Sequence, residues 1–117
     1  MKILIVEDSQ LSRRMLIQTL KRDDYKITVA IDGSDAMKKM KLDTPDLVIT
    51  DIMMPFVSGL ELVSWIKENF DDNIKIIILT SLGDEEVVLE AFSLGVDDFI
   101  TKPFDYDDLC SRIERFK

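Results

Sequence analysis

Four short, uninterrupted apolar runs recur along the chain and constrain its fold more than any other feature. They are Ile3–Val6, Leu47–Ile49, Ile76–Leu79 and Phe99–Ile100. Continuous runs of this length, rich in β-branched residues, are typical of strands buried on both faces of a sheet. Residues Lys26–Ala30 alternate between polar and apolar instead, which is typical of an edge strand.

Apolar residues at helical spacing fill the segments between these strands. The repeats lie at Leu16 and Leu20, from Ala36 to Met40, from Leu60 to Ile66, from Val87 to Leu94 and from Leu109 to Phe116. Strict alternation of strands and helices predicts an α/β fold of the (βα)5 type, a doubly wound parallel sheet with helices on both faces. We expect residues 1–117 to form a single domain, because no linker, repeat or second pattern interrupts them.

Charge and composition exclude several classes of function. The net charge of −8 argues against a direct nucleic-acid or anionic-membrane partner. The chain has no histidine, which excludes histidine-based nucleophile systems, histidine-ligated zinc and a self-contained histidine phosphorelay. Its single cysteine cannot form an internal disulfide, and no apolar run approaches the ~20 residues that span a membrane. We therefore expect a cytoplasmic protein.

Polar side chains follow four of the predicted strands. Glu7 and Asp8 follow the first, Asp51 the third, Thr80 the fourth and Lys102 the fifth. Ligands of open α/β sheets bind beyond the carboxyl ends of the strands, so we expect these five residues to converge at one edge of the sheet.

Such a cluster indicates phosphoryl chemistry. Three neighbouring carboxylates repel one another unless a cation lies among them, and oxygen ligands suit a hard ion such as Mg²⁺. An aspartate can attack phosphorus, while a metal, a lysine and a hydroxyl stabilise the phosphoryl oxygens. Taken alone, each residue has a structural interpretation: Asp8 could be a helix N-cap, Lys102 a solvent-exposed lysine and Thr80 the last residue of a strand. Their joint placement at the ends of the predicted strands favours a common functional site for phosphoryl chemistry.

In these residues the sequence resembles the response-regulator receiver family of two-component signalling, the CheY-like domains, along nearly its whole length. The resemblance implies a flavodoxin-like sheet of order 2-1-3-4-5. It rests on the acidic pair Glu7–Asp8, on Asp51 within Leu47–Pro55 followed by Gly59, on Thr80, and on Lys102–Pro103–Phe104.

The resemblance also implies roles for the site residues. Asp51 would accept a phosphoryl group from a partner histidine kinase or phosphotransfer protein. Asp8 and Asp51 would ligate Mg²⁺, with Mn²⁺ as an alternative, Glu7 would act through water, and Met53 would offer its backbone carbonyl. The chain would be a signalling switch rather than a turnover enzyme.

Further implied features concern the switch itself. Lys102 would pair with the phosphoryl group, and the Lys102–Pro103 peptide bond would be cis. On phosphorylation Thr80 would move toward the phosphoryl group, and Phe99, which has no hydroxyl, would turn inward. These movements would alter the surface of the fourth helix, fifth strand and fifth helix, which controls an output domain or effector protein.

Two side chains beside the predicted site bear on the lifetime of the phosphorylated state. Met53 and Leu82 are both apolar, so neither can orient a hydrolytic water molecule. We therefore expect slow autodephosphorylation.

The predicted output surface carries apolar residues that its helices do not need for the core. Leu89, Phe92 and Cys110 would form an exposed partner patch, unless the fourth helix rolls and buries one of them. In receivers of the winged-helix transcription-factor subfamily such a patch mediates dimerisation and is ringed by salt bridges. Asp98 and Arg112 could supply one of these in a phosphorylation-dependent homodimer.

Leu11 and Met15 lie one turn apart on the first helix, off its core-facing stripe. They are candidates for docking the phosphodonor, and scattered surface apolar residues are an equally good interpretation.

Three other functions remain as alternatives. A haloacid-dehalogenase-like phosphatase would need an acid two residues after Asp51, where this chain has Met53. A flavodoxin-like nucleotide-binding module would need a phosphate loop where Glu7 and Asp8 stand. A degenerate receiver would act only as a protein-interaction module. The sequence shows no output domain, which is compatible with a stand-alone regulator or with the receiver part of a longer chain.

Overall fold

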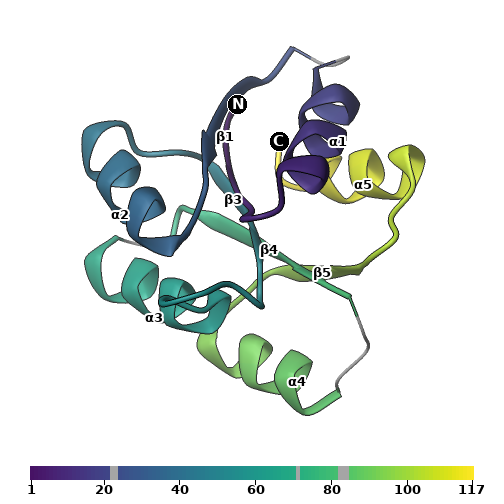
Figure 1. Ribbon diagram of the computed structural model, residues 1–117. Coiled ribbons are helices and arrows are strands. Elements are labelled where there is room, and N and C mark those ends of the chain that lie inside the picture. Colours follow the sequence, from purple (N-terminus) through teal and green to yellow (C-terminus); the bar gives the residue numbers. More distant parts are fainter. Residues whose placement is uncertain (22–23, 71, 82–84) are drawn as a thin grey trace.

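Five strands and five helices alternate in the computed structural model, which describes residues 1–21, 24–70, 72–81 and 85–117 (Figure 1). This alternation confirms the predicted α/β class. The strands are β1 (Lys2–Val6), β2 (Lys26–Ala30), β3 (Leu47–Asp51), β4 (Lys75–Thr80) and β5 (Asp98–Thr101). The helices are α1 (Gln10–Leu20), α2 (Gly33–Leu42), α3 (Gly59–Asn69), α4 (Glu85–Leu94) and α5 (Tyr106–Glu114).

The strands form one parallel sheet in the order β2-β1-β3-β4-β5, as the resemblance implied. The edge strand β2 alternates between exposed and half-buried residues until the buried Ala30, in agreement with its alternating sequence. The central strand β3 is buried along its whole length, because helices cover both faces of the sheet.

The sheet divides the hydrophobic core into two clusters on opposite faces. Leu4 and Val48 belong to the cluster that packs against α2, α3 and α4. Their neighbours Ile5 and Ile49 belong to the cluster beneath α1 and α5. Figure 1 shows these two groups of helices on either side of the sheet. Successive side chains of a strand point to opposite faces, so each uninterrupted apolar run contributes to both clusters.

Short polar side chains begin four of the helices. Ser9, Asp32, Ser58 and Asp105 each accept a hydrogen bond from the backbone N–H three residues later. These N-caps satisfy backbone donors that have no partner within the helix. Since Ser9 caps α1, the preceding acid, Asp8, is not the cap of that helix.

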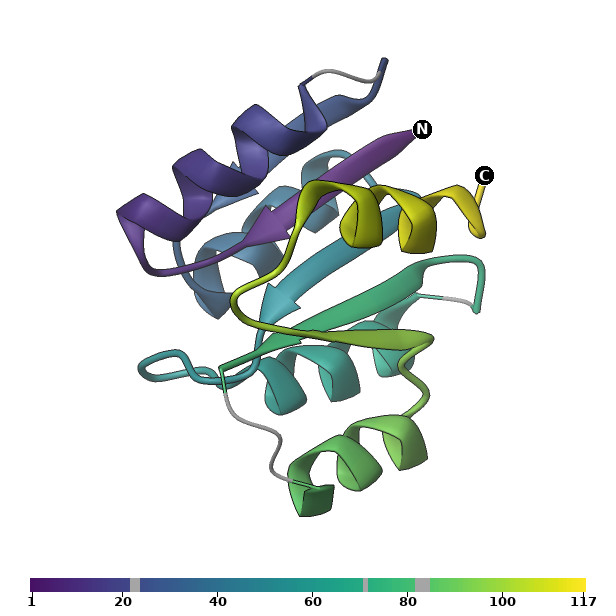
Figure 2. The ribbon, with the colours of Figure 1, turned by 90° about the vertical axis from the view of Figure 1, so that its right-hand side faces the viewer.

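The connections that follow the strands gather at one edge of the sheet. Figure 2 shows the β1–α1, β3–α3 and β5–α5 connections together there, with both chain termini at the opposite edge. The helices of the described residues are too short or too polar to cross a membrane.

Candidate functional site

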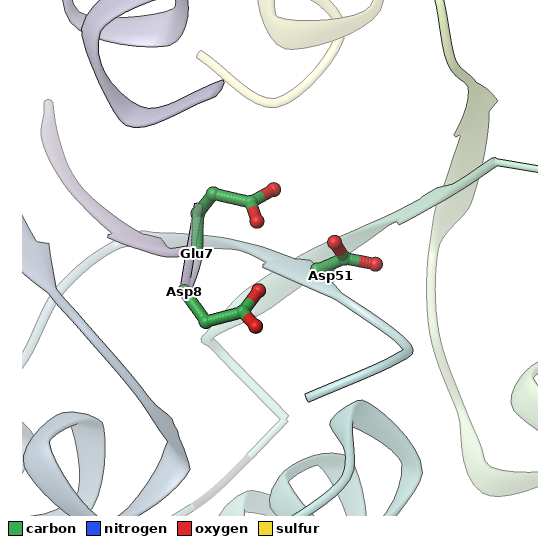
Figure 3. A group of neighbouring side chains, drawn as sticks. All are labelled: Glu7, Asp8 and Asp51. Atoms are coloured by element: carbon green, nitrogen blue, oxygen red, sulfur yellow. The ribbon is translucent and has the colours of Figure 1, made fainter. Parts of the chain in front are cut away.

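Three carboxylates meet where β1 and β3 end. One oxygen from each of Glu7, Asp8 and Asp51 lies within 4.8 Å of the others, and Figure 3 shows the three side chains side by side. Glu7 is fully buried, Asp51 is only 6% exposed, and Asp8 lies at the surface. The cluster is therefore enclosed by protein on one side and open to solvent at Asp8.

Lys102 enters this cluster from the β5–α5 connection. Its Nζ donates to Glu7 Oε2 at 2.7 Å and to Asp51 Oδ2 at 2.8 Å. Its backbone N–H donates to the carbonyl of Thr80 at 2.7 Å, which ties the end of β5 to the end of β4. The Lys102–Pro103 peptide bond is cis, as expected. Lys102 is therefore in direct contact with two of the three predicted acids, although residue 102 lies far from residues 7 and 51 in the sequence.

Burial and pairing shift the pKa values of two of these groups. Burial raises the pKa of Glu7, and the hydrogen bonds from Lys102 and from the Ser9 N–H offset part of this rise. Burial alone would lower the pKa of Lys102, but its hydrogen bonds to Asp51 and Glu7 outweigh burial, so that this pKa is raised. The raised pKa of Glu7 thus follows from burial, and the raised pKa of Lys102 follows from its two carboxylate partners.

Three carboxylates and one ammonium leave the cluster short of positive charge. All the side-chain ligand atoms are oxygens, and they are close enough to share one ion. This donor set fits a hard divalent cation such as Mg²⁺ and not a soft metal.

The first residues after β3 also contact the nucleophile candidate. The backbone N–H of Met53 donates to Asp51 Oδ1 at 3.2 Å, so both carboxylate oxygens of Asp51 accept hydrogen bonds. The Met53 side chain is 79% exposed. Leu82, the other residue predicted to flank the site, lies outside the described residues.

Arg13 is a site residue that the sequence analysis missed. Its Nη1 donates to the backbone carbonyls of Glu7 at 2.8 Å and of Asp8 at 3.0 Å. The guanidinium of α1 thereby holds the connection that carries both acids. Sequence offers no signal for this role, since the neighbouring Arg14 has the same chemistry and is exposed.

Gly59 allows the chain to pass close to the site at the start of α3. A Cβ atom at this position would lie 2.2 Å from the carbonyl oxygen of Asp51, closer than any side chain permits. The Gly59 N–H donates to the carbonyl of Ile52 at 2.8 Å, which closes the β3–α3 connection at its base. Glycine is required here by space.

Thr80 and Phe99 are the two residues to which the resemblance assigns switch roles. Thr80 is 8% exposed at the end of β4. Phe99 is half-buried and packs edge to face against Phe92 of α4, with the ring centroids 5.9 Å apart. Arg112 donates to the Phe99 carbonyl at 3.0 Å and to Asp98 Oδ1 at 2.6 Å. Within this single chain, Asp98 and Arg112 therefore pair with each other.

The predicted contact residues are at the surface. On α4, Leu89 is 69% exposed and Phe92 is 42% exposed, while Cys110 of α5 is half-buried. On α1, Leu11 and Met15 are both exposed. Helix α4 has therefore not rolled to bury either of its outer apolar residues.

Comparisons with known proteins agree with this geometry. The family model described as "Response regulator receiver domain" matches residues 3–114. The response regulator ArlR of Staphylococcus saprophyticus is 37% identical over 96% of this chain and 50% of its own length. The chemotaxis protein CheY of Treponema pallidum is also 37% identical, over 96% of this chain and 79% of its own length.

Solved structures give the same result. The response regulator TrrA of Thermotoga maritima, solved in complex with Mg²⁺-BeF, has a TM-score of 0.89 and 34% identity to this chain. The similarity covers 99% of this chain and 98% of that one. The chain spans about half the length of several curated relatives that it matches, ArlR among them. It belongs to the response regulator receiver domains, the phosphoacceptor modules of two-component signalling.

Proposed function

We propose that Asp51 is the phosphoacceptor of this chain and that a histidine kinase or phosphotransfer protein is its donor. The observation that carries this assignment is the contact of Asp51 with Lys102 inside a cluster of two further acids. An isolated aspartate at a strand end would have neither a metal site nor a cationic partner for the transferred group.

The proposed transfer is a single displacement at phosphorus. An oxygen of Asp51 forms a bond to phosphorus as the bond between phosphorus and the donor imidazole nitrogen breaks. The electron pair of the broken bond returns to that nitrogen, and the product is an acyl phosphate on Asp51. The Met53 N–H, which donates to Asp51 Oδ1, helps to hold the carboxylate in place.

Asp8 and Asp51 would hold Mg²⁺ directly, with Glu7 acting through water and Met53 through its backbone carbonyl. Mn²⁺ could replace Mg²⁺ at such a site. When bound, the ion supplies positive charge to the phosphoryl oxygens. The cluster of the three carboxylates supports this ligand set, as does the Mg²⁺-BeF complex of the similar protein TrrA.

Lys102 has two roles in this proposal. In the free chain its ammonium compensates the charge of Glu7 and Asp51. After transfer it pairs with the new phosphoryl oxygens, while the Thr80 hydroxyl donates to another of them. Both groups come from the ends of neighbouring strands, β5 and β4, so their movement reaches the adjacent α4.

The output would then lie on α4, β5 and α5. Movement of Thr80 lets Phe99 turn inward and leave the ring of Phe92, which changes the exposed patch of Leu89, Phe92 and Cys110. An output domain or effector protein would recognise this surface. A phosphorylation-dependent homodimer through it would require Asp98 and Arg112 to exchange their internal pairing for a pairing across the interface.

The phosphodonor would approach along α1. An apolar groove of about 260 Å³ lies between Met15 of α1 and Phe104 of the β5–α5 connection, and Lys102 forms part of its wall. Leu11, on the preceding turn of α1, is 69% exposed. A donor helix that lies in this groove would bring its histidine to the acidic cluster.

Labelling with acetyl phosphate and Mg²⁺, followed by intact-mass measurement, tests the proposal. We expect one phosphoryl group on the wild type and on Asp107→Asn, which removes an exposed aspartate of α5, and none on Asp51→Asn. A wild type that takes up no phosphoryl group would refute the proposal and favour a degenerate receiver that acts only through protein contacts. Labelling of Asp51→Asn would place the acceptor elsewhere.

A further inference from the structure

The connection between β3 and α3 carries two large apolar side chains in solvent. Phe56 is 94% exposed and Met53 is 79% exposed. Figure 2 shows this connection projecting beyond the edge of the sheet at which the strands end. An aromatic side chain so exposed buries almost no surface in the free chain, so it does not stabilise the fold through the hydrophobic effect.

Phe56 also has an unfavourable backbone conformation. Its φ is +69°, and the N–H of Val57 donates to the carbonyl of Pro55 at 2.8 Å. A hydrogen bond between residues two apart, around a central residue of positive φ, defines the rare and strained form of the γ-turn. Glycine adopts this conformation readily, whereas a side chain makes it costly.

The residues on both sides of Phe56 hold it in this position. Val57 is packed so tightly against α2 that a Cβ atom on Gly33 would lie 2.6 Å from Val57 Cγ1. The Gly59 N–H binds the carbonyl of Ile52 and closes the connection at its base. These contacts fix the turn in place, and the turn holds the ring of Phe56 in solvent. Strain of this kind at a site is a reason to look for a function.

The position of Phe56 in the connection that begins at Asp51 indicates which kind of partner its ring would contact. The same connection begins at Asp51, whose Oδ1 accepts the hydrogen bond of the Met53 N–H. A protein that delivers a phosphoryl group must bring its imidazole to the Asp51 carboxylate, so its surface must cover the residues around that carboxylate. The exposed side chains of Met53 and Phe56 would then be desolvated against the donor.

We propose that Met53 and Phe56 form a docking contact for the phosphodonor protein and that Phe56 discriminates between donors. The matching surface of the donor is an apolar patch beside its phosphohistidine. This contact is separate from the α1 groove, and it deepens the proposed function, on which it rests. A buried aromatic anchor can dominate the energy of a protein interface, so a single side chain can set the preference.

Two phosphodonors of different size test the inference. Phe56→Gly and Phe56→Asn both tolerate positive φ and remove the aromatic ring. Leu42→Ala is the matched control, because Leu42 is 87% exposed at the far end of α2. The protein donors are the autophosphorylated histidine kinases of the same organism, and the small donor is acetyl phosphate.

We expect both Phe56 variants to accept the phosphoryl group about tenfold more slowly from the kinase that labels the wild type fastest. Acetyl phosphate, which is too small to need the docking contact, should label them at the wild-type rate. Leu42→Ala should match the wild type with both donors. An unchanged or higher Tm for Phe56→Gly would show that the slower transfer does not come from misfolding.

Other outcomes would overturn the inference. Equal kinase transfer rates for the wild type and the Phe56 variants would remove the docking role while leaving Asp51 as the phosphoacceptor. Labelling by acetyl phosphate but by no kinase would also overturn it. A dimer in sedimentation that Phe56→Gly abolishes, without any change in transfer, would assign the ring to self-association. Failure of acetyl phosphate to label the wild type would refute the proposed function itself.

Discussion

At the scale of single residues, the site is arranged for ligand binding at the expense of stability. Glu7 is fully buried and Asp51 nearly so, and the ammonium of Lys102 pairs with both of them, while the carboxylate of Asp8 lies beside them. Carboxylates held this close disfavour the folded state unless a cation joins them. The same repulsion is what makes cation binding favourable.

Replacing Asp8 should therefore stabilise the cation-free protein and weaken the binding of Mg²⁺. In the absence of divalent cations, we expect Asp8→Asn to be more stable than the wild type by about 1 kcal/mol, because one like-charge contact is removed. Added Mg²⁺ should raise the Tm of the wild type and have much less effect on this variant. Thermal melts with and without Mg²⁺ measure both effects. Asp107→Asn, which is outside the cluster, should respond to Mg²⁺ like the wild type.

Arg13 should affect Mg²⁺ binding indirectly, because it holds the backbone that carries Glu7 and Asp8 and is not itself a ligand. Removing its two hydrogen bonds in Arg13→Gln frees the carbonyls of Glu7 and Asp8, and we expect Mg²⁺ affinity to fall about tenfold. Arg14→Gln removes the same charge from the next residue and should leave affinity near the wild-type value. Calorimetric Mg²⁺ titration distinguishes them. Equal losses in both variants would indicate an effect of net charge alone.

Met53 should govern how long the phosphoryl group remains. Its side chain is exposed beside Asp51 and cannot orient a water molecule. Met53→Asn keeps the backbone carbonyl and adds a polar group, so we expect phospho-Asp51 to decay severalfold faster. Met53→Leu should decay like the wild type. Decay of the intact-mass signal after removal of acetyl phosphate gives the lifetimes, and identical lifetimes for all three chains would contradict the prediction.

At the scale of elements, the connections carry the chemistry and the strands hold them in register. Lys102 and Thr80 are brought together by the backbone hydrogen bond between β5 and β4, and Asp51 is positioned by the return of the chain at Gly59. The geometry of the site therefore depends on the backbone positions of the connections relative to the strand ends. A small displacement of one connection separates groups that must act together.

Substitution of Gly59 should displace the whole start of α3. We expect Gly59→Ala to lower the free energy of unfolding by about 3 kcal/mol, because the new Cβ would meet the backbone of Asp51 and Ile52. Labelling by acetyl phosphate should fall as well. Ser58→Ala, which removes only the N-cap, should cost about 1 kcal/mol and leave labelling intact. Urea unfolding and mass measurement compare the two variants.

For the whole molecule, the sequence pattern was sufficient to predict a parallel sheet and the convergence of the acids, whereas the strand order came from the family resemblance. Continuous apolar runs indicate strands buried on two faces, and the ends of parallel strands must share one edge. The pattern could not predict Arg13, because only tertiary contacts distinguish it from Arg14. It also missed the γ-turn at Phe56, since Pro55-Phe56-Val57 contains no glycine or asparagine to indicate positive φ.

The two clusters on opposite faces of the sheet should unfold together. Leu16 and Leu62 are fully buried leucines in different clusters. We expect alanine at either position to cost about 2–5 kcal/mol. Trp65 packs against the same cluster as Leu62. Its fluorescence should nevertheless report the loss of stability in Leu16→Ala equally well, because the strands shared by the two clusters make them unfold together. Fluorescence and circular dichroism transitions that diverge in Leu16→Ala would contradict a single cooperative unit.

The ion pair of Lys102 with Glu7 joins residues 95 positions apart. During synthesis the acids of β1 and β3 leave the ribosome well before the lysine that bridges them. A nascent or truncated chain that lacks residue 102 cannot assemble the bridge, whatever the state of its earlier strands. The charge balance of the site is therefore completed only when the fifth strand has joined the sheet beside the first four.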